Sequence, residues 1–195
     1  GMVVTNDEDL YKKSLYYKNV SFSLDGIRNY RHEDIGFNYR ISNLHAAIGL
    51  AQVEKADEYR QMRIRNAQIY KRYLEGVEGI TLQKTKDSVI HVHWMNGILV
   101  NHAEYGRSRD ELMLHLNENK IETRLFFIGM HRQPSLLKYG CDGTGYYPVT
   151  DALTNNGFYL PSASNLKEEQ IKYICQIIKK FKKRKYFNIP SGECV

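Results

Sequence analysis

The stretch Gly36-Phe37-Asn38-Tyr39-Arg40 places an amide and a guanidinium two residues apart, just ahead of an expected helix. An asparagine amide can donate two hydrogen bonds, and a guanidinium can grip an oxyanion with two parallel ones. Donors at a helix entrance suit a phosphate group, because the N-terminus of a helix attracts anions. A capped turn followed by a solvated arginine explains the same residues, so the residue types leave both interpretations open.

A second group of chemically capable residues lies between Arg124 and His131. Arg124, Phe126, Phe127 and His131 bring a cation, two aromatic rings and an imidazole to the end of one expected strand. Such a set could border a polar ring-containing ligand. The alternative is a core strand that carries a solvated arginine.

Other kinds of site find less support in the sequence. His91 and His93 would face the same side of a strand, but the sequence places no third ligand beside them, so we do not favour a metal site. The sequence holds neither a nucleophile elbow nor a P-loop nor a dinucleotide-binding glycine motif.

The elements that must position these residues can be expected from hydrophobic periodicity and capping signals. In the first part of the chain we expect a strand at 2–5 and a helix capped by Asn6 or Asp7 that runs to Lys18. An irregular stretch follows at 19–41, then a helix capped by Ser42 or Asn43, then a long amphipathic helix from Ala56 to Gly76 or Gly79.

In the rest of the chain, short strands alternate with helices. We expect strands at 80–82, 91–100 and 121–128, an extended segment at 158–162, and helices at 107–120, 133–140, 148–157 and 166–183. This order predicts an α/β fold in which a small antiparallel or mixed sheet is covered by helices.

Composition sets broader limits. The 195 residues include 42% hydrophobic residues and carry a formal net charge of +6, which predicts a folded domain with a core. The three cysteines suit neither a disulfide framework nor a zinc site, so we expect a reducing, cytoplasmic setting. The basic run at 179–185 reads as a solvated helix end, with nucleic-acid binding as the alternative.

Several motifs, taken in order, carry a family resemblance. They are MVVTNDEDLYKK, GFNYRISNLHAAIGLAQVEKAD, HVHWM, IETRLFFIGMHRQP, YLPS and EEQIKYICQIIKKF. Together, from Met2 to about Lys183, they resemble the C-terminal half of the DegT-type sugar-nucleotide aminotransferases.

The resemblance implies the fold-type-I architecture of pyridoxal-phosphate enzymes. It also implies the family's dimeric assembly and its reaction, the transfer of an amino group, usually from glutamate, to a keto-sugar nucleotide. Residues 1–55 would belong to the large cofactor domain and 56–185 to the small C-terminal domain, with 186–195 as a tail. Asn38 would bind the cofactor phosphate of the partner subunit, and Arg40, placed nearby as a further cofactor-binding residue, would meet that phosphate or the sugar nucleotide. His32, Arg124, Phe127 and His131 would lie on the side of the sugar nucleotide.

The chain also departs from the family pattern. The lysine that holds the cofactor covalently, and the aspartate that pairs with its ring nitrogen, lie ahead of the Met2 stretch in the family. We therefore expect these residues alone not to catalyse transamination. Asn19-Val20-Ser21 stands where the family is often glycine-rich, and Ile128-Gly129 where Tyr-Pro is common.

The resemblance leaves two functions open. One is a portion of a sugar-nucleotide aminotransferase that works as a homo-oligomer, a dimer above all, or with a separate chain carrying the lysine half. The other is a non-catalytic domain that binds a nucleotide sugar or assists assembly.

Overall fold

The structure is a computed structural model that describes residues 1–26 and 30–182. The chain divides into two compact units, one from Gly1 to Ala56 and one from Asp57 onward. We describe each unit by itself. Among the described residues, no helix is both long and apolar enough to cross a bilayer.

The first unit contains two helices that begin where local capping chemistry predicts. Helix α1 spans Glu8–Lys18, and the Asp7 side chain accepts a hydrogen bond from the Leu10 amide at 2.9 Å. Helix α2 spans Asn43–Glu54 and is capped by Ser42, which accepts from the His45 amide. Each cap satisfies an amide that the first turn leaves without a helical partner. Both predicted helix starts are confirmed.

The strand expected at 2–5 is wrong. These residues form no strand, and Met2, Val3 and Val4 are exposed. A strand needs a neighbouring strand to satisfy its backbone groups. Within the described residues of this unit, backbone pairing of the sheet type is limited to one bridge, between Asn19 and Asn38.

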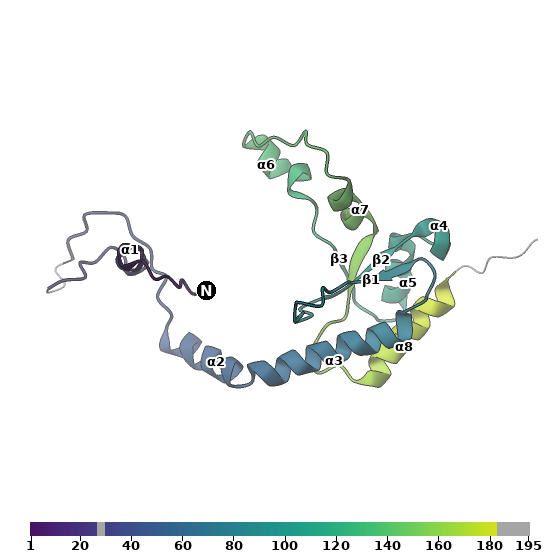
Figure 1. Cartoon of the computed structure of the whole chain (residues 1–195). Helices are drawn as coiled ribbons and strands as arrows, with labels where there is room; N and C mark the ends of the chain where they lie inside the picture. Colours follow the sequence, from purple (N-terminus) through teal and green to yellow (C-terminus); the bar gives the residue numbers. More distant parts are fainter. Residues whose placement is uncertain (27–29, 183–195) are drawn as a thin grey trace, which may run out of the picture. The chain divides into compact units, whose positions relative to one another are not determined.

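The second unit is built around a four-stranded antiparallel sheet (Figure 1). The strand order is β1-β2-β4-β3, and its elements in chain order are α3 (Ala56–Leu74), β1 (Ile80–Leu82), β2 (Asn96–Val100), α4 (His102–Tyr105), α5 (Arg109–Glu118), β3 (Arg124–Leu125), the 3-10 turn η1 (Met130–Arg132), α6 (Pro134–Lys138), α7 (Pro148–Asn156), β4 (Gly157–Leu160) and α8 (Glu168–Phe181). The small helix-covered sheet that the sequence predicts is confirmed.

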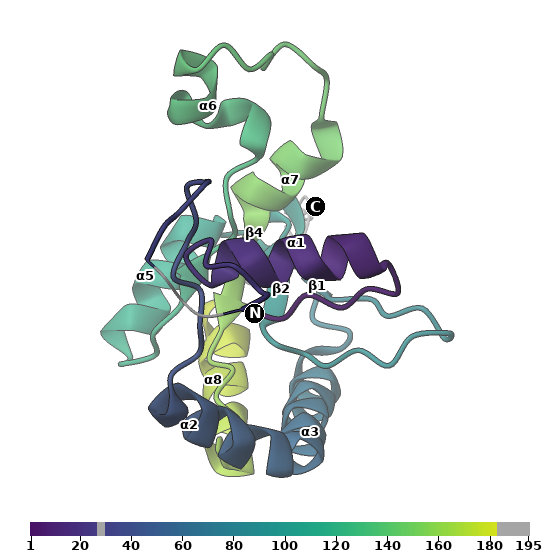
Figure 2. The same ribbon diagram turned by 90° about the vertical axis from the view of Figure 1, so that its left-hand side faces the viewer.

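The core of this unit lies between one face of the sheet and three helices. Every second residue of β2 is buried, as expected for a strand with one covered face. Helices α3, α5 and α8 supply the opposing side chains, and α8 lies beside α3 in both views (Figures 1 and 2). The main core residues are Ile69, Leu74, Ile98, Val100, Leu112, Leu116, Phe158, Leu160, Ile171, Ile174 and Ile178.

Two predicted strands are shorter than expected. The strand predicted at 91–100 begins only at Asn96, because His93 takes a positive φ of 46° that no strand continues through. The strand predicted at 121–128 is reduced to Arg124–Leu125. Its partner β4 begins at Gly157, directly after α7, so residues past Phe126 have no strand left to pair with.

On the opposite face of the sheet, Phe126 fixes the point where the chain leaves β3. A Cβ atom at Gly97 would lie 2.8 Å from the Phe126 ring, and one at Gly157 would overlap that ring. The ring also packs on Tyr159, with centroids 4.4 Å apart. The absence of side chains at Gly97 and Gly157 thus makes room for the Phe126 ring. The segment that follows Phe126 therefore starts from a fixed position.

Candidate functional site

The loop that holds Asn38 and Arg40 is tied to the end of α1 by backbone hydrogen bonds. The amide of Phe37 donates to the Tyr17 carbonyl at 2.7 Å, and the amide of Tyr39 donates to the Lys18 carbonyl at 3.0 Å. Phe37 and Tyr39 stack their rings, 5.2 Å apart and nearly parallel. Because side chains alternate along an extended segment, Asn38 points away from this aromatic pair.

Asn38 and Arg40 form one unit of hydrogen-bond donors. The Nε of Arg40 donates to the Oδ1 of Asn38 at 2.9 Å, which fixes the two side chains relative to each other. Within the described part of the chain, the Nδ2 of Asn38 and the terminal nitrogens of Arg40 have no hydrogen-bond partner, and both side chains are exposed. Such a set of exposed donors can bind an oxyanion such as a phosphate group.

The start of this loop packs unusually closely. Val20 and Ser21 both have positive φ angles, 61° and 52°. A Cβ atom at Gly36 would overlap the backbone of Ser21. Glycine adopts a positive φ without strain, so this backbone conformation would suit glycine better than Val20 and Ser21.

His32 belongs to the same unit, and the structure uses its ring inside the loop. Its Nδ1 donates to the Val20 carbonyl at 2.8 Å, and its ring lies against Phe22 with centroids 4.6 Å apart. With Nδ1 committed as the donor, Nε2 remains available as an acceptor.

The second predicted group lies in the other unit, where α6 and α7 lead away from the sheet (Figures 1 and 2). The Phe127 side chain is 75% exposed. Arg124 is also exposed, and its guanidinium lies 3.6 Å from the Glu122 carboxylate. An ion pair this exposed contributes little to stability, so the guanidinium can exchange it for a ligand oxyanion.

His131 differs from its neighbours because its side chain is only 12% exposed. Its Nε2 lies 3.1 Å from the Oδ1 of Asp151 on α7, and its ring packs on Tyr147. Arg132 reaches the same helix, with Nη1 3.3 Å from the Oδ1 of Asn155. Sequence reasoning missed Asp151 and Asn155, because 20 residues separate Asp151 from its partner and no local motif marks either.

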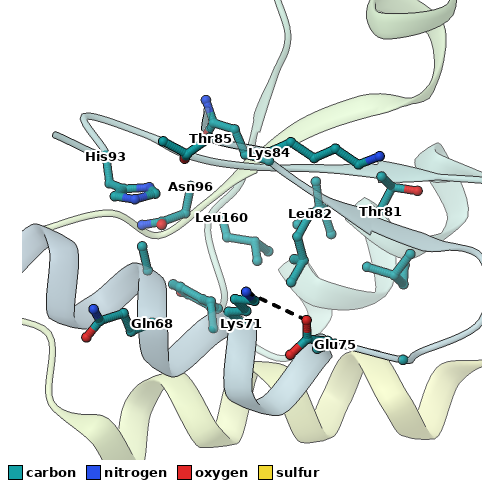
Figure 3. Close-up of a pocket in the computed structure, with 17 residues that line it drawn as sticks. Gln68, Lys71, Glu75, Thr81, Leu82, Lys84, Thr85, His93, Asn96 and Leu160 are labelled. Carbon is teal, nitrogen blue, oxygen red and sulfur yellow. Dashed lines mark ion pairs between the residues drawn. The ribbon is translucent and has the colours of Figure 1, made fainter. Parts of the chain in front are cut away.

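A cavity of about 580 Å³ lies elsewhere in the same unit, between α3 and the chain around β1 (Figure 3). Lys71 and Glu75 of α3 form an ion pair on one wall, 3.7 Å apart. His93 and Asn96 lie together at one end (Figure 3). Burial, together with neighbouring His91, lowers the pKa of His93 below its ordinary value. The six predicted residues do not line this cavity.

The strand geometry that suggested His91 and His93 as paired ligands is absent. The two rings pack together with centroids 4.2 Å apart, and the Nδ1 of His91 accepts a hydrogen bond from the His93 amide at 2.8 Å. Across residues 1–26 and 30–182, no group of three His, Cys, Asp or Glu side chains is placed to hold a metal ion.

Comparison with known proteins identifies the family. The model of the DegT/DnrJ/EryC1/StrS aminotransferase family matches residues 1–179. The chain belongs to this family. The GDP-perosamine synthase of Escherichia coli O157:H7 is 39% identical over 182 residues, and that of Vibrio cholerae is 33% identical over 181 residues. Each match covers 93% of this chain, which confirms the resemblance seen in the motifs.

Solved structures support the same fold. PseC of Helicobacter pylori, an aminotransferase of pseudoaminic acid biosynthesis, superposes with a TM-score of 0.78 at 20% identity and covers 91% of this chain. DesI, solved with its TDP-sugar product, gives a TM-score of 0.77 at 23% identity and the same coverage. The expected fold-type-I architecture is therefore confirmed.

The chain spans about half the length of the relatives that it matches. The aligned part is 47% of the E. coli protein, 47% of PseC and 44% of DesI. The matched half contains both groups of predicted residues. The family and its structural neighbours depend on pyridoxal phosphate.

Proposed function

We propose that these residues form the C-terminal half of a pyridoxal-phosphate-dependent sugar-nucleotide aminotransferase of the GDP-perosamine synthase type. It would serve surface polysaccharide biosynthesis by moving an amino group from glutamate to a keto-sugar nucleotide. The observation that carries the proposal is the match to the E. coli GDP-perosamine synthase, at 39% identity over 93% of the chain.

The role proposed for Asn38 and Arg40 is to bind the cofactor phosphate of a partner subunit. The two side chains are joined by one hydrogen bond and are exposed on one loop, so their remaining donors can approach a phosphate that another polypeptide holds. When bound, pyridoxal phosphate supplies the electron sink for amino-group transfer. The residues of this chain contribute binding and orientation of its phosphate.

His32, Arg124, Phe127 and His131 are proposed to border the sugar nucleotide. The guanidinium of Arg124 would bind a diphosphate oxygen, and the exposed ring of Phe127 would cover an apolar face of the ligand. The free Nε2 of His32 would accept a hydrogen bond from a hydroxyl group.

We further propose that transamination needs a lysine from outside these 195 residues. In the family that lysine lies ahead of the stretch matched by Met2, and Lys12 and Lys18 occupy α1, which follows that stretch. Catalysis would then require a polypeptide that supplies it, in the same chain or another.

Reductive trapping tests this requirement. The purified 195-residue chain is mixed with pyridoxal phosphate, reduced with borohydride and digested, and labelled lysines are located by mass spectrometry. We expect only scattered, substoichiometric labelling of exposed lysines. One lysine labelled at one equivalent, together with amino transfer from glutamate, would refute the requirement.

Calorimetry tests ligand binding. We expect the chain to bind GDP-mannose, used as the probe, and Arg124→Ala to weaken that binding by about tenfold, as for loss of one charge-assisted hydrogen bond. Arg60→Ala is the matched control, because Arg60 lies on α3 and pairs with Asp57. Equal affinity of Arg124→Ala and the wild type would remove Arg124 from the site.

A further inference from the structure

The segment from Phe127 to Arg132 has two distinct sides. Phe127 and Met130 are 75% and 72% exposed, whereas His131 is nearly buried. Because a merely solvated loop would leave all of these side chains free, the contrast indicates that one side of the segment is held.

Helix α7 holds that side through one row of polar side chains. Asp151, Thr154 and Asn155 stand at positions i, i+3 and i+4, so they share one helix face. Thr154 donates from Oγ1 to the Phe127 carbonyl at 3.1 Å, Asp151 meets the His131 imidazole at 3.1 Å, and Asn155 meets Arg132 at 3.3 Å. Three successive contacts thus bind the whole segment to one helix.

The helix is itself attached to the body of the unit. Arg109, on α5, donates from Nη1 to the Thr154 carbonyl at 2.6 Å, and its side chain is 16% exposed. Packing is close at the turn as well, since a Cβ atom at Gly129 would lie 2.7 Å from the Thr150 methyl group. The position of the segment is therefore set by α5 and α7 rather than by the segment alone.

We propose that α7 is the positioning element of the sugar-nucleotide site. His131, at the border of that site, acts as a positioning residue that Asp151 holds, and it does not itself touch the substrate. This inference rests on the function proposed above. The imidazole faces Asp151 and Tyr147, and the paired contact leaves Phe127 and Met130 as the side chains presented to a ligand. Asp151 matters more than Asn155, because Asp151 contacts both His131 and Arg132, whereas the contact of Asn155 is with the half-exposed Arg132 side chain.

The proposal predicts a defined hydrogen-bonded state of His131. With Asp151 as acceptor, the neutral imidazole carries its proton on Nε2. At pH 8 the nitrogen chemical shifts of the ring should show this tautomer in the wild type and in Asp151→Asn, which keeps an acceptor oxygen. Asp151→Ala should lose the preference.

The closing experiment compares Asp151→Ala, Asp151→Asn and the control Asp142→Ala. Asp142 lies in the same part of the chain, is exposed and binds only Thr144 in its own turn. Asp151→Ala should raise amide exchange at 127–133 about tenfold and weaken GDP-mannose binding about tenfold, the effect of losing one hydrogen bond. Asp151→Asn should restore both, and Asp142→Ala should change neither.

The outcomes separate this inference from the proposed function. If the wild type fails to bind GDP-mannose, the proposed function loses its support, whereas the tautomer and exchange data still decide whether α7 positions the segment. Unchanged tautomer and exchange in Asp151→Ala would overturn the inference. Faster amide exchange in Asp151→Ala with unaltered GDP-mannose binding would also overturn it. So would an Asp151→Asn variant that binds GDP-mannose as weakly as Asp151→Ala does.

Discussion

Val20 adopts a backbone conformation that a β-branched residue rarely takes. Its φ of 61° lies in the left-handed region, where a Cβ atom costs roughly 1–2 kcal/mol, and Ser21 follows at 52°. The conformation persists because the loop is bound on both sides, by the Phe37 carbonyl and by the His32 ring. Strain of this kind beside a candidate site is expected where the surrounding contacts over-determine the backbone.

Replacing Val20 by glycine should therefore tighten the loop. We expect Val20→Gly to stabilise the first unit by about 1 kcal/mol, because glycine removes the strain at some cost in unfolded-state entropy. Slower hydrogen exchange of the Phe37 and Tyr39 amides in Val20→Gly would show this stabilisation. Val53→Gly, on the exposed surface of α2, is the control and should destabilise its helix. Faster exchange in Val20→Gly would contradict the argument.

His93 gives a second prediction at this scale. Its pKa is lowered from 6.5 by burial and by His91, so the unfolded chain takes up this proton at higher pH than the folded one. Stability is therefore greatest above pH 6.5 and decreases as the pH falls through the folded pKa.

His93→Asn should remove that part of the pH dependence, and asparagine tolerates the positive φ of this position. Urea unfolding between pH 5 and pH 8, followed by fluorescence of Trp94, the single tryptophan, measures it in the second unit. His102→Asn, at an exposed position, should keep the wild-type slope. Identical slopes in His93→Asn and the wild type would count against the assignment.

At the scale of elements, the contact between Phe126 and two strands controls where the segment at 127–132 begins. Gly157→Ala would place a methyl group against the Phe126 ring and the Leu153 carbonyl. We expect a loss of about 1–3 kcal/mol, typical of overpacking, in urea unfolding followed by Trp94 fluorescence. Gly49→Ala, on α2 with open space around it, should leave this transition unchanged. A neutral Gly157→Ala would show that the ring moves freely.

At the scale of the whole molecule, helix α2 stands out because its apolar side chains are exposed. It carries Leu44, Ile48, Leu50 and Val53, all at least 60% exposed, and none of its residues is buried. A helix this apolar, without a covered side, indicates a surface that another polypeptide covers. Family members are generally homodimeric, and we propose that a second copy covers part of it here.

Light scattering across a concentration series tests this proposal. We expect a homo-oligomer for the wild type and a shift toward monomer for Ile48→Glu, which places a charge on the apolar surface of α2. Ile90→Glu, at an isoleucine of the other unit that is at least as exposed, is the control and should leave the mass unchanged. A monodisperse monomer at all concentrations would refute the proposal.

Parts of the fold follow from local sequence alone. Asp7 and Ser42 each cap a helix where predicted, because a cap needs only a side-chain oxygen and an amide two or three residues away. The buried side of α8 was likewise predictable, since Ile171, Ile174 and Ile178 recur at the helical period. The prediction of a tail at 186–195 and part of the basic run at 179–185 lie outside the described residues.

Motifs, caps and hydrophobic periods are local or keep their order along the chain, so the sequence alone indicated the family, most of the helices and the residues that could bind a ligand. Only the tertiary structure decided the extent of the strands and the partners of His131 and Phe126. Strand pairing stops where β4 gives way to α7. Asp151 lies 20 residues from His131, and both glycines that contact Phe126 lie farther away still. Such contacts depend on folding distant segments together, which no local pattern encodes.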